Sequence, residues 1–111
     1  MRKVIQRLIS LLIALAVIFV ASCSLQASQR TQALEKVAVG DTQESVVERL
    51  GQPSRSELPG HPYSLYASRG CVAPCAVRLW WEWPVLRGIE AWSVDLGADH
   101  HVLQTAHWVS P

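Results

Sequence analysis

The chain has 111 residues, with ten Lys and Arg, nine Asp and Glu, and a formal net charge of +1. No run of Lys or Arg indicates a nucleic-acid partner. Without residues 1–22, seven basic and nine acidic residues remain, which gives a formal charge of −2. The 89 residues of that remainder suit one small domain with a limited core and exclude two domains with an active-site cleft between them.

Residues 1–22 have the layout of a secretory signal peptide. Arg2, Lys3 and Arg7 form a basic start, and an unbroken apolar stretch follows from Leu11 to Ala21. A basic region, a short apolar region and small residues before a cleavage point are typical of such signals. A transmembrane helix is the alternative. The stretch is short of the roughly 20 apolar residues that span a bilayer core, although thinning or tilt can accommodate a short helix.

The end of this segment, Val20-Ala21-Ser22-Cys23, resembles the lipobox of bacterial lipoproteins. The resemblance implies cleavage before Cys23 and acylation of its thiol. Two or more acyl chains give stable membrane anchoring. The alternative is an ordinary signal boundary with a free or buried cysteine. Ser24 follows, where an aspartate would be the familiar signal for inner-membrane retention. The resemblance to sorted lipoproteins therefore implies the outer membrane, with the domain facing the periplasm.

The cysteine count fits this interpretation. Three cysteines in an exported protein leave one thiol unpaired. If Cys23 carries lipid, Cys71 and Cys75 form an even pair, and disulfides persist in an oxidising compartment. The intervening loop is short enough to close. The sequence therefore predicts a disulfide between Cys71 and Cys75.

Two helices are expected before the chain changes character. Residues 23–32 are small and polar, which predicts a lipid-anchored tether ahead of a domain at 33–111. A short helix is expected in the region Thr31–Val37. A second helix ends at Leu50; Asp41 or Thr42 can cap its start, and Gly51 and Pro53 end it.

From Ser54 onward apolar residues alternate, which indicates strands. They are expected at Tyr63–Ser68, Val77–Trp83, Ile89–Leu96 and Val102–Val109, the last without a fixed register. Short helices followed by an antiparallel meander predict an α+β fold. We expect a two-layer sandwich, with short N-terminal helices packed on a three- to four-stranded antiparallel sheet.

The five tryptophans are many for this length. Trp81, Trp83 and Trp92 lie on apolar strand faces, which indicates a core position. Trp80 differs, because it stands on the opposite face beside Arg78. Since Trp and Arg are enriched in interface hot spots, Arg78 and Trp80 are predicted to form a partner-facing patch. The alternative is that this face is covered as well.

A family resemblance rests on the segment from Val39 to Pro53, which contains Val39-Gly40-Asp41-Thr42, Val46 and Leu50-Gly51-Gln52-Pro53. It resembles the opening motif of the SmpA/OmlA family of outer-membrane lipoproteins, in which Gly40, Thr42, Gly51 and Pro53 would be structural motif residues. The resemblance implies a lipidated cysteine, a short helix, a terminal antiparallel sheet and a non-catalytic role in outer-membrane protein assembly. The stretch Gly70–Trp83 lies outside that pattern and indicates a divergent branch with another partner.

No pattern of residues indicates catalysis. The chain has neither a nucleophile elbow nor a phosphate-binding glycine loop, so neither an enzyme nor a cofactor is predicted. Its histidines could in principle join the cysteines in a zinc or copper site, but their positions lack the spacing of ligand pairs, so no metal is predicted. These histidines are His61, His100, His101 and His107.

Three functions remain to be compared. The first is an outer-membrane lipoprotein that acts as a non-catalytic scaffold or accessory binding module, in outer-membrane protein assembly or envelope integrity. Its partners would be the membrane, through acyl chains on Cys23, and a protein of the outer membrane or periplasm, with no nucleic acid. The alternative is a lipid-tethered periplasmic inhibitor of a cell-wall hydrolase that inserts the loop Gly70–Cys75 into a cleft. A redox or metal carrier is the third and would require Cys71 and Cys75 to be reduced.

Overall fold

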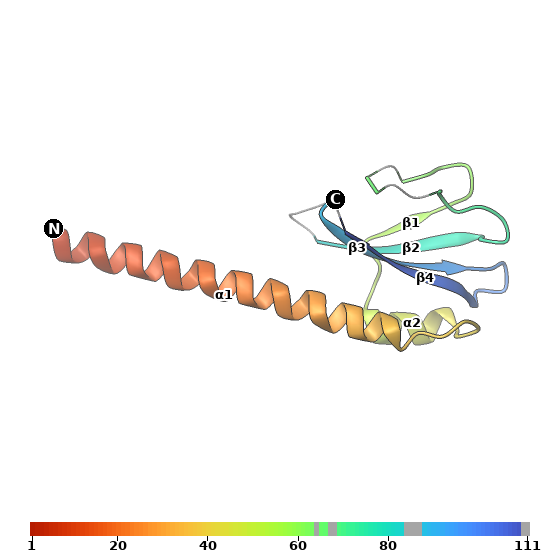
Figure 1. Cartoon of the computed structure of the whole chain (residues 1–111), viewed down its shortest axis with the longest axis horizontal. Coiled ribbons are helices and arrows are strands. Elements are labelled where there is room, and N and C mark those ends of the chain that lie inside the picture. Colours follow the sequence, from red (N-terminus) through yellow and green to blue (C-terminus); the bar gives the residue numbers. More distant parts are fainter. Residues whose placement is uncertain (64, 67–68, 84–87, 110–111) are drawn as a thin grey trace.

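The computed structural model describes residues 1–63, 65–66, 69–83 and 88–109. A single antiparallel sheet has the strand order β1-β2-β3-β4. Helices pack on one face of the sheet (Figure 1), which confirms the predicted α+β arrangement. The elements are α1 (Arg2–Glu35), α2 (Gln43–Leu50), β1 (Arg55–Glu57), β2 (Val77–Glu82), β3 (Glu90–Leu96) and β4 (Val102–Val109).

Helix α1 is far longer than the short helix predicted at Thr31–Val37. It has 34 residues, and its N-terminal part projects away from the sheet (Figure 1). Residues 23–32, predicted as a lipid-anchored tether, are part of this helix. No glycine or proline interrupts residues 2–35, and Ala27 and Leu34 fall on one helix face that packs on the core.

Helix α2 begins and ends as the sequence predicts. Thr42 is its N-cap, and its side-chain oxygen accepts a hydrogen bond of 3.2 Å from the backbone N–H of Ser45. Asp41 caps the preceding turn instead, by accepting from the N–H of Ala38 at 2.9 Å. Gly51 ends the helix with φ +82°, a conformation that favours glycine.

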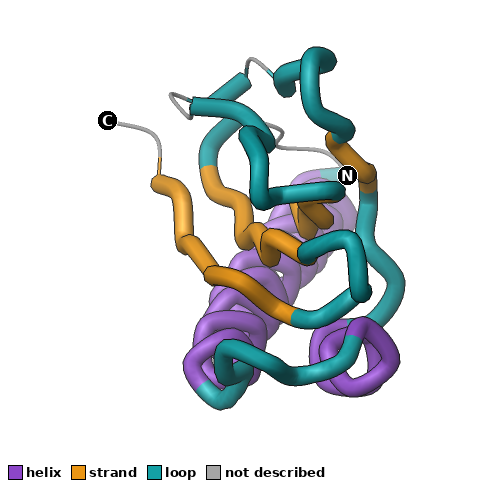
Figure 2. The backbone as a smooth tube through the Cα atoms, turned by 90° about the vertical axis from the view of Figure 1, so that its right-hand side faces the viewer, coloured by secondary structure: helices purple, strands orange, loops and turns teal. Residues whose placement is uncertain are grey.

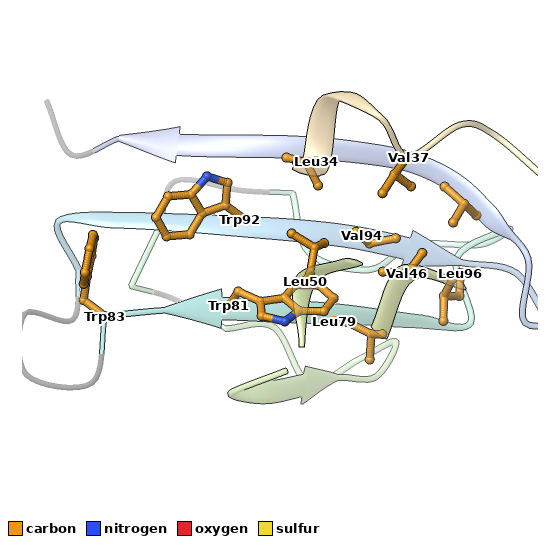
Figure 3. Close-up of a cluster of buried hydrophobic side chains, with 11 residues drawn as sticks. Leu34, Val37, Val46, Leu50, Leu79, Trp81, Trp83, Trp92, Val94 and Leu96 are labelled. Carbon is orange, nitrogen blue, oxygen red and sulfur yellow. The ribbon is translucent and has the colours of Figure 1, made fainter. Parts of the chain in front are cut away.

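The main core lies between the two helices and one face of the sheet (Figure 3). Alternate residues of β2 and β3 supply its floor, as the two-residue period predicts, and the C-terminal turn of α1 and the apolar face of α2 supply its roof. The core residues are Leu34, Val37, Val46, Leu50, Leu79, Trp81, Trp83, Trp92, Val94, Leu96 and Val102.

The opposite face of the sheet is also covered. The connection between β1 and β2 packs over it, whereas the helices lie on the other side (Figure 2). Tyr66 comes from this connection and forms a second buried cluster with Trp80 and Ala91. The two central strands, β2 and β3, are therefore buried on both faces, although the alternation in their sequence predicts one face in contact with solvent.

The predicted strand at Tyr63–Ser68 is wrong for the residues that can be described. Tyr63, Leu65 and Tyr66 lie in the connection, and residues 64 and 67–68 fall outside the described parts of the chain. The first strand is β1, which pairs with β2 in the register Arg55 to Trp80 and Glu57 to Arg78. Three polar residues carry no apolar alternation, so β1 gives no sequence signal.

Candidate functional site

Cys23 lies on α1 at the point where the helix leaves the domain. Its side chain is half-buried and packs against the edge of the main core, and it has no disulfide partner. Helix α1 is long and apolar enough to cross a membrane, and a signal sequence near an N-terminus fits the same description. The residues before Cys23 are exposed throughout.

Contacts of Arg30 and Thr31 fix the position of α1 on the sheet. The Arg30 guanidinium lies 5.4 Å from the ring centre of Trp92 and donates to the carbonyl of Glu82 at 3.3 Å. The Trp92 Nε1–H donates to Thr31 Oγ1 at 3.1 Å. These contacts attach the C-terminal half of α1 to the domain, so the sheet-packed segment begins before the predicted boundary at residue 33.

Cys71 and Cys75 lie at disulfide distance, as predicted, with Sγ atoms 2.12 Å apart. Both cysteines are buried, whereas Val72 at the tip of the ring is 64% exposed. The backbone N–H of Cys71 donates to the carboxylate of Glu57. The ring is therefore held against the sheet by its base and presents its tip to solvent.

Removal of this disulfide should lower the free energy of unfolding by about 2 kcal/mol, the loop-entropy value for so short a ring. The double substitution Cys71→Ala with Cys75→Ala makes the change, and denaturant titration of both proteins measures it. Dithiothreitol added to the unmodified protein is the matched control and should give a similar loss. If neither treatment changes the unfolding midpoint, the ring does not stabilise the fold.

The predicted patch of Arg78 and Trp80 is not exposed, so this part of the prediction is wrong. Arg78 is 5% exposed and Trp80 is fully buried. Both do lie on the face opposite the helices, as the alternation indicates, but the connection between β1 and β2 covers that face. The covering segment has no regular pattern that would have revealed its position in the sequence.

Arg78 is the centre of a buried ionic cluster. Its Nε–H and Nη2–H groups donate to Asp95 at 2.6 and 3.1 Å, and Nη2–H also donates to the carbonyl of Gly70 at 3.0 Å. Glu57 Oε2 is 4.0 Å from Arg78 Nη1, and Gln104 donates to Asp95 at 2.6 Å. Burial alone would lower the pKa of Arg78, but the hydrogen bonds and charge of Asp95 and the charge of Glu57 outweigh that effect, so the pKa is raised. The guanidinium therefore stays charged.

Trp80 is the centre of a neighbouring aromatic cluster. Its ring stacks on Tyr66 at 5.2 Å between centres and meets Tyr63 at 5.6 Å and Trp108 at 5.8 Å. The Trp80 Nε1–H donates to Glu57 at 3.1 Å. Two tyrosines of the connection thus cover Trp80, so its role is structural.

Tyr66 predicts a loss of stability at alkaline pH. Burial raises the pKa of its hydroxyl above the ordinary value of 10.0, and the hydroxyl donates to Glu82 at 3.1 Å. As the pH rises above 10.0, the unfolded tyrosine ionises while the folded one stays neutral, so stability falls. Unfolding of the wild type and of Tyr66→Phe over alkaline pH measures this. The phenylalanine variant should show a shallower decline, and equal slopes would contradict the assignment to Tyr66.

Strand β4 forms an open edge of the sheet. In β3, the carbonyl of Leu96 accepts from the N–H of Ala76, so the backbone groups of Leu96 point toward β2. Successive residues of an antiparallel strand direct their backbone groups to opposite sides. The backbone groups of every second β3 residue, beginning with Asp95, therefore point toward β4. From the register of β3 and β4, the backbone groups of Thr105, His107 and Val109 point away from the sheet. Among the described residues, no backbone partner meets these outward groups.

The composition of β4 leaves this edge unprotected. Natural edge strands are usually short or carry charges or proline, which prevents pairing with another chain. At the other edge β1 has three residues, whereas β4 has eight and contains no Lys, Arg, Asp, Glu or Pro. Within the described parts of the chain, backbone hydrogen bonds cover this edge at its first residue alone, where Val102 exchanges two bonds of 2.8 Å with Gly40 and Asp41. Sequence reasoning missed the edge because the register of this strand could not be fixed.

An acidic surface cleft of about 850 Å³ lies where α2 begins, beside the turn between β3 and β4. Glu44, Glu48 and Asp99 contribute carboxylates, and His100 and His101 contribute imidazoles. His101 Nδ1 contacts the carbonyl of Asp99 at 2.9 Å. In the described residues no three His, Cys, Asp or Glu side chains converge as metal ligands.

The predicted motif residues lie around α2 and its entry. Gly40 has φ +93° and donates to the carbonyl of Val102, Thr42 caps the helix, and Gly51 and Pro53 follow its end. These residues join α2 to the sheet, and none of them approaches Cys71, Cys75 or the buried Arg78 cluster through a hydrogen bond.

Comparison with protein-family models, curated proteins and solved structures finds no match to the chain.

Proposed function

We propose that the chain is an outer-membrane lipoprotein, anchored by acyl chains on Cys23, that acts as a non-catalytic accessory binding module facing the periplasm. The lipobox-like end of the apolar segment supports the anchor, and the paired cysteines support an oxidising compartment. The motif from Val39 to Pro53, which resembles the SmpA/OmlA family, supports a role in outer-membrane protein assembly or envelope integrity.

The open edge of β4 is the observation that carries the binding role. The outward-facing N–H and C=O groups of Thr105, His107 and Val109 can pair with an extended segment of another protein. Such pairing takes its affinity from backbone hydrogen bonds and needs no catalytic group. The proposed partner is therefore a protein of the outer membrane or periplasm that adds a strand beside β4.

A proline substitution tests the binding role. Thr105→Pro removes an outward N–H, which an edge strand tolerates because that group takes no part in the native ladder. Thr105→Val is the matched control, since it removes the hydroxyl and keeps the N–H. Each protein is expressed at full length in a bacterium with an outer membrane, and gently solubilised membranes are analysed for proteins that co-purify.

We expect the wild type and Thr105→Val to retain the same partner and Thr105→Pro to lose it while still fractionating with the membrane. Barrel-assembly components among the lost proteins would support the assembly role. If Thr105→Pro retains every partner of the wild type, β4 is not the binding site. If the wild type emerges alone, the accessory role itself is contradicted.

The disulfide ring supports the alternative, an inhibitor of a cell-wall hydrolase. The tip of the ring at Val72 is exposed, whereas its base is buried and held by a hydrogen bond from Cys71. Because the ring is held in this way, it would lose little conformational entropy on entering a cleft. If this function holds, the protein should reduce hydrolase activity in proportion to its concentration, and Val72→Asp should abolish the effect. No inhibition of any wall hydrolase tested would exclude this function.

A further inference from the structure

We propose that the domain stands end-on to the bilayer, with the end of the sheet that carries Ile89 and Val109 lying on the lipid surface. This end is called the proximal end below. The inference rests on the proposed anchor at Cys23 and adds to it an orientation and a contact surface. The occupant of this surface is the bilayer that holds the acyl chains.

The position of Cys23 carries the first step. Arg30 reaches the carbonyl of Glu82 at the last residue of β2. Cys23 lies seven residues earlier on the same helix, about 10 Å further along its axis, in the direction that leads off the proximal end (Figure 1). Because Cys23 packs against the core and is not separated from it by a flexible linker, acyl chains on its thiol bring the proximal end to the membrane.

The side chains at the proximal end suit a lipid interface. Ile89 is 50% exposed and Val109 is 65% exposed, and the register of β3 and β4 places them at the same end of the sheet. Trp83 lies beside them, and its Nε1–H donates to Glu90 at 3.1 Å. The Trp83 ring itself is buried in the main core, so the exposed side chains of Ile89 and Val109 provide the apolar contact with the lipid surface.

The charges of the described residues also favour this orientation. At the proximal end the carboxylate of Glu90 is held by Trp83 and by His107 at 2.7 Å, and the nearby cation is Arg30. The opposite end carries the exposed carboxylates of the acidic cleft, Glu44, Glu48 and Asp99. An anionic bilayer surface therefore meets the less acidic end of the domain, and the acidic end faces away from it.

Two valines provide a matched test, because they are similarly exposed and lie at opposite ends. Val109 is 65% exposed at the end of β4, and Val39 is 76% exposed beside its start, so the length of β4, roughly 24 Å, separates the two sites. With Cys23 acylated and Cys71 and Cys75 paired, a cysteine at either position is the only free thiol. Ile89→Cys provides a second proximal site if Val109→Cys fails to fold.

The experiment labels each full-length, lipidated variant with an environment-sensitive fluorophore and reconstitutes it into vesicles of phosphatidylethanolamine and phosphatidylglycerol. Flotation measures anchoring, and phospholipids with a shallow spin-label quencher measure contact. We expect all variants to float, with quenching at residues 109 and 89 at least threefold that at residue 39. If the proteins float but all sites are quenched equally, the orientation is wrong and the anchor stands. If the lipidated protein does not float, both are overturned.

Discussion

Trp80→Ala should lower the free energy of unfolding by about 3 to 5 kcal/mol, the usual cost of truncating a buried tryptophan. The indole is fully buried, and its removal empties the space between the sheet and the two tyrosines that cover it. The carboxylate of Glu57 also loses the Nε1–H donor. Because a small domain has only about 5 to 15 kcal/mol of stability, the variant should be largely unfolded at moderate denaturant. Guanidinium titration of the full chain in mild detergent, followed by near-UV circular dichroism, measures the change.

Trp108→Ala is the control for this experiment. Trp108 is half-buried at the rim of the same cluster and donates to Ser93 at 2.8 Å, so its truncation should cost clearly less. If both substitutions lower the free energy of unfolding by the same small amount, the connection between β1 and β2 does not cover the sheet. An exposed patch at Trp80 would then be restored as a hypothesis.

Arg78→Met should destabilise the fold by about 3 to 5 kcal/mol, because it leaves Asp95 and Glu57 charged and buried without their cation. The pKa of Arg78 is raised, so its stabilising charge is fully present below the ordinary pKa of an arginine and is lost only as the pH rises through the higher folded pKa. The wild type therefore keeps this charge throughout the neutral range, and the destabilisation is measured there. The same denaturant titration at two neutral pH values measures it.

Arg55→Met is the matched control, since it makes the same substitution on the adjacent strand. The Arg55 side chain is 42% exposed and lies 3.8 Å from Glu82, so the loss of this ion pair should cost less than about 1 kcal/mol. A loss at Arg78 no larger than that at Arg55 would contradict a buried, tightly coupled ionic cluster.

The sequence predicted the parts of the fold that have a strong local signal. Thr42, Gly51 and Pro53 mark the limits of α2 because capping and helix termination depend on nearby residues. The alternation in β2 and β3 correctly assigned Trp81 and Trp92 to the core. It could not show that the opposite face is buried as well, because Arg78 on that face is paired with Asp95 from a different strand.

The parts that the sequence did not predict depend on tertiary contacts. Strand β1 consists of polar residues, and Glu57 is buried there because it accepts from Trp80, Tyr63 and Cys71 and lies beside the Arg78 guanidinium. The small and polar residues 23–32 suggest a flexible tether, yet Thr31 is held by Trp92. At the candidate site, the Cys71–Cys75 pair follows from counting cysteines, whereas the open β4 edge follows only from the register of the sheet.

The acylated Cys23 is the central claim, and intact mass spectrometry of the protein extracted from bacterial membranes tests it most directly. The wild type should begin at Cys23 and carry the added mass of its acyl groups, with Cys71 and Cys75 oxidised. The Cys23→Ser variant should retain residues 1–22 and lack that added mass. A wild-type mass that matches the unmodified chain with residues 1–22 still attached would contradict the lipid anchor.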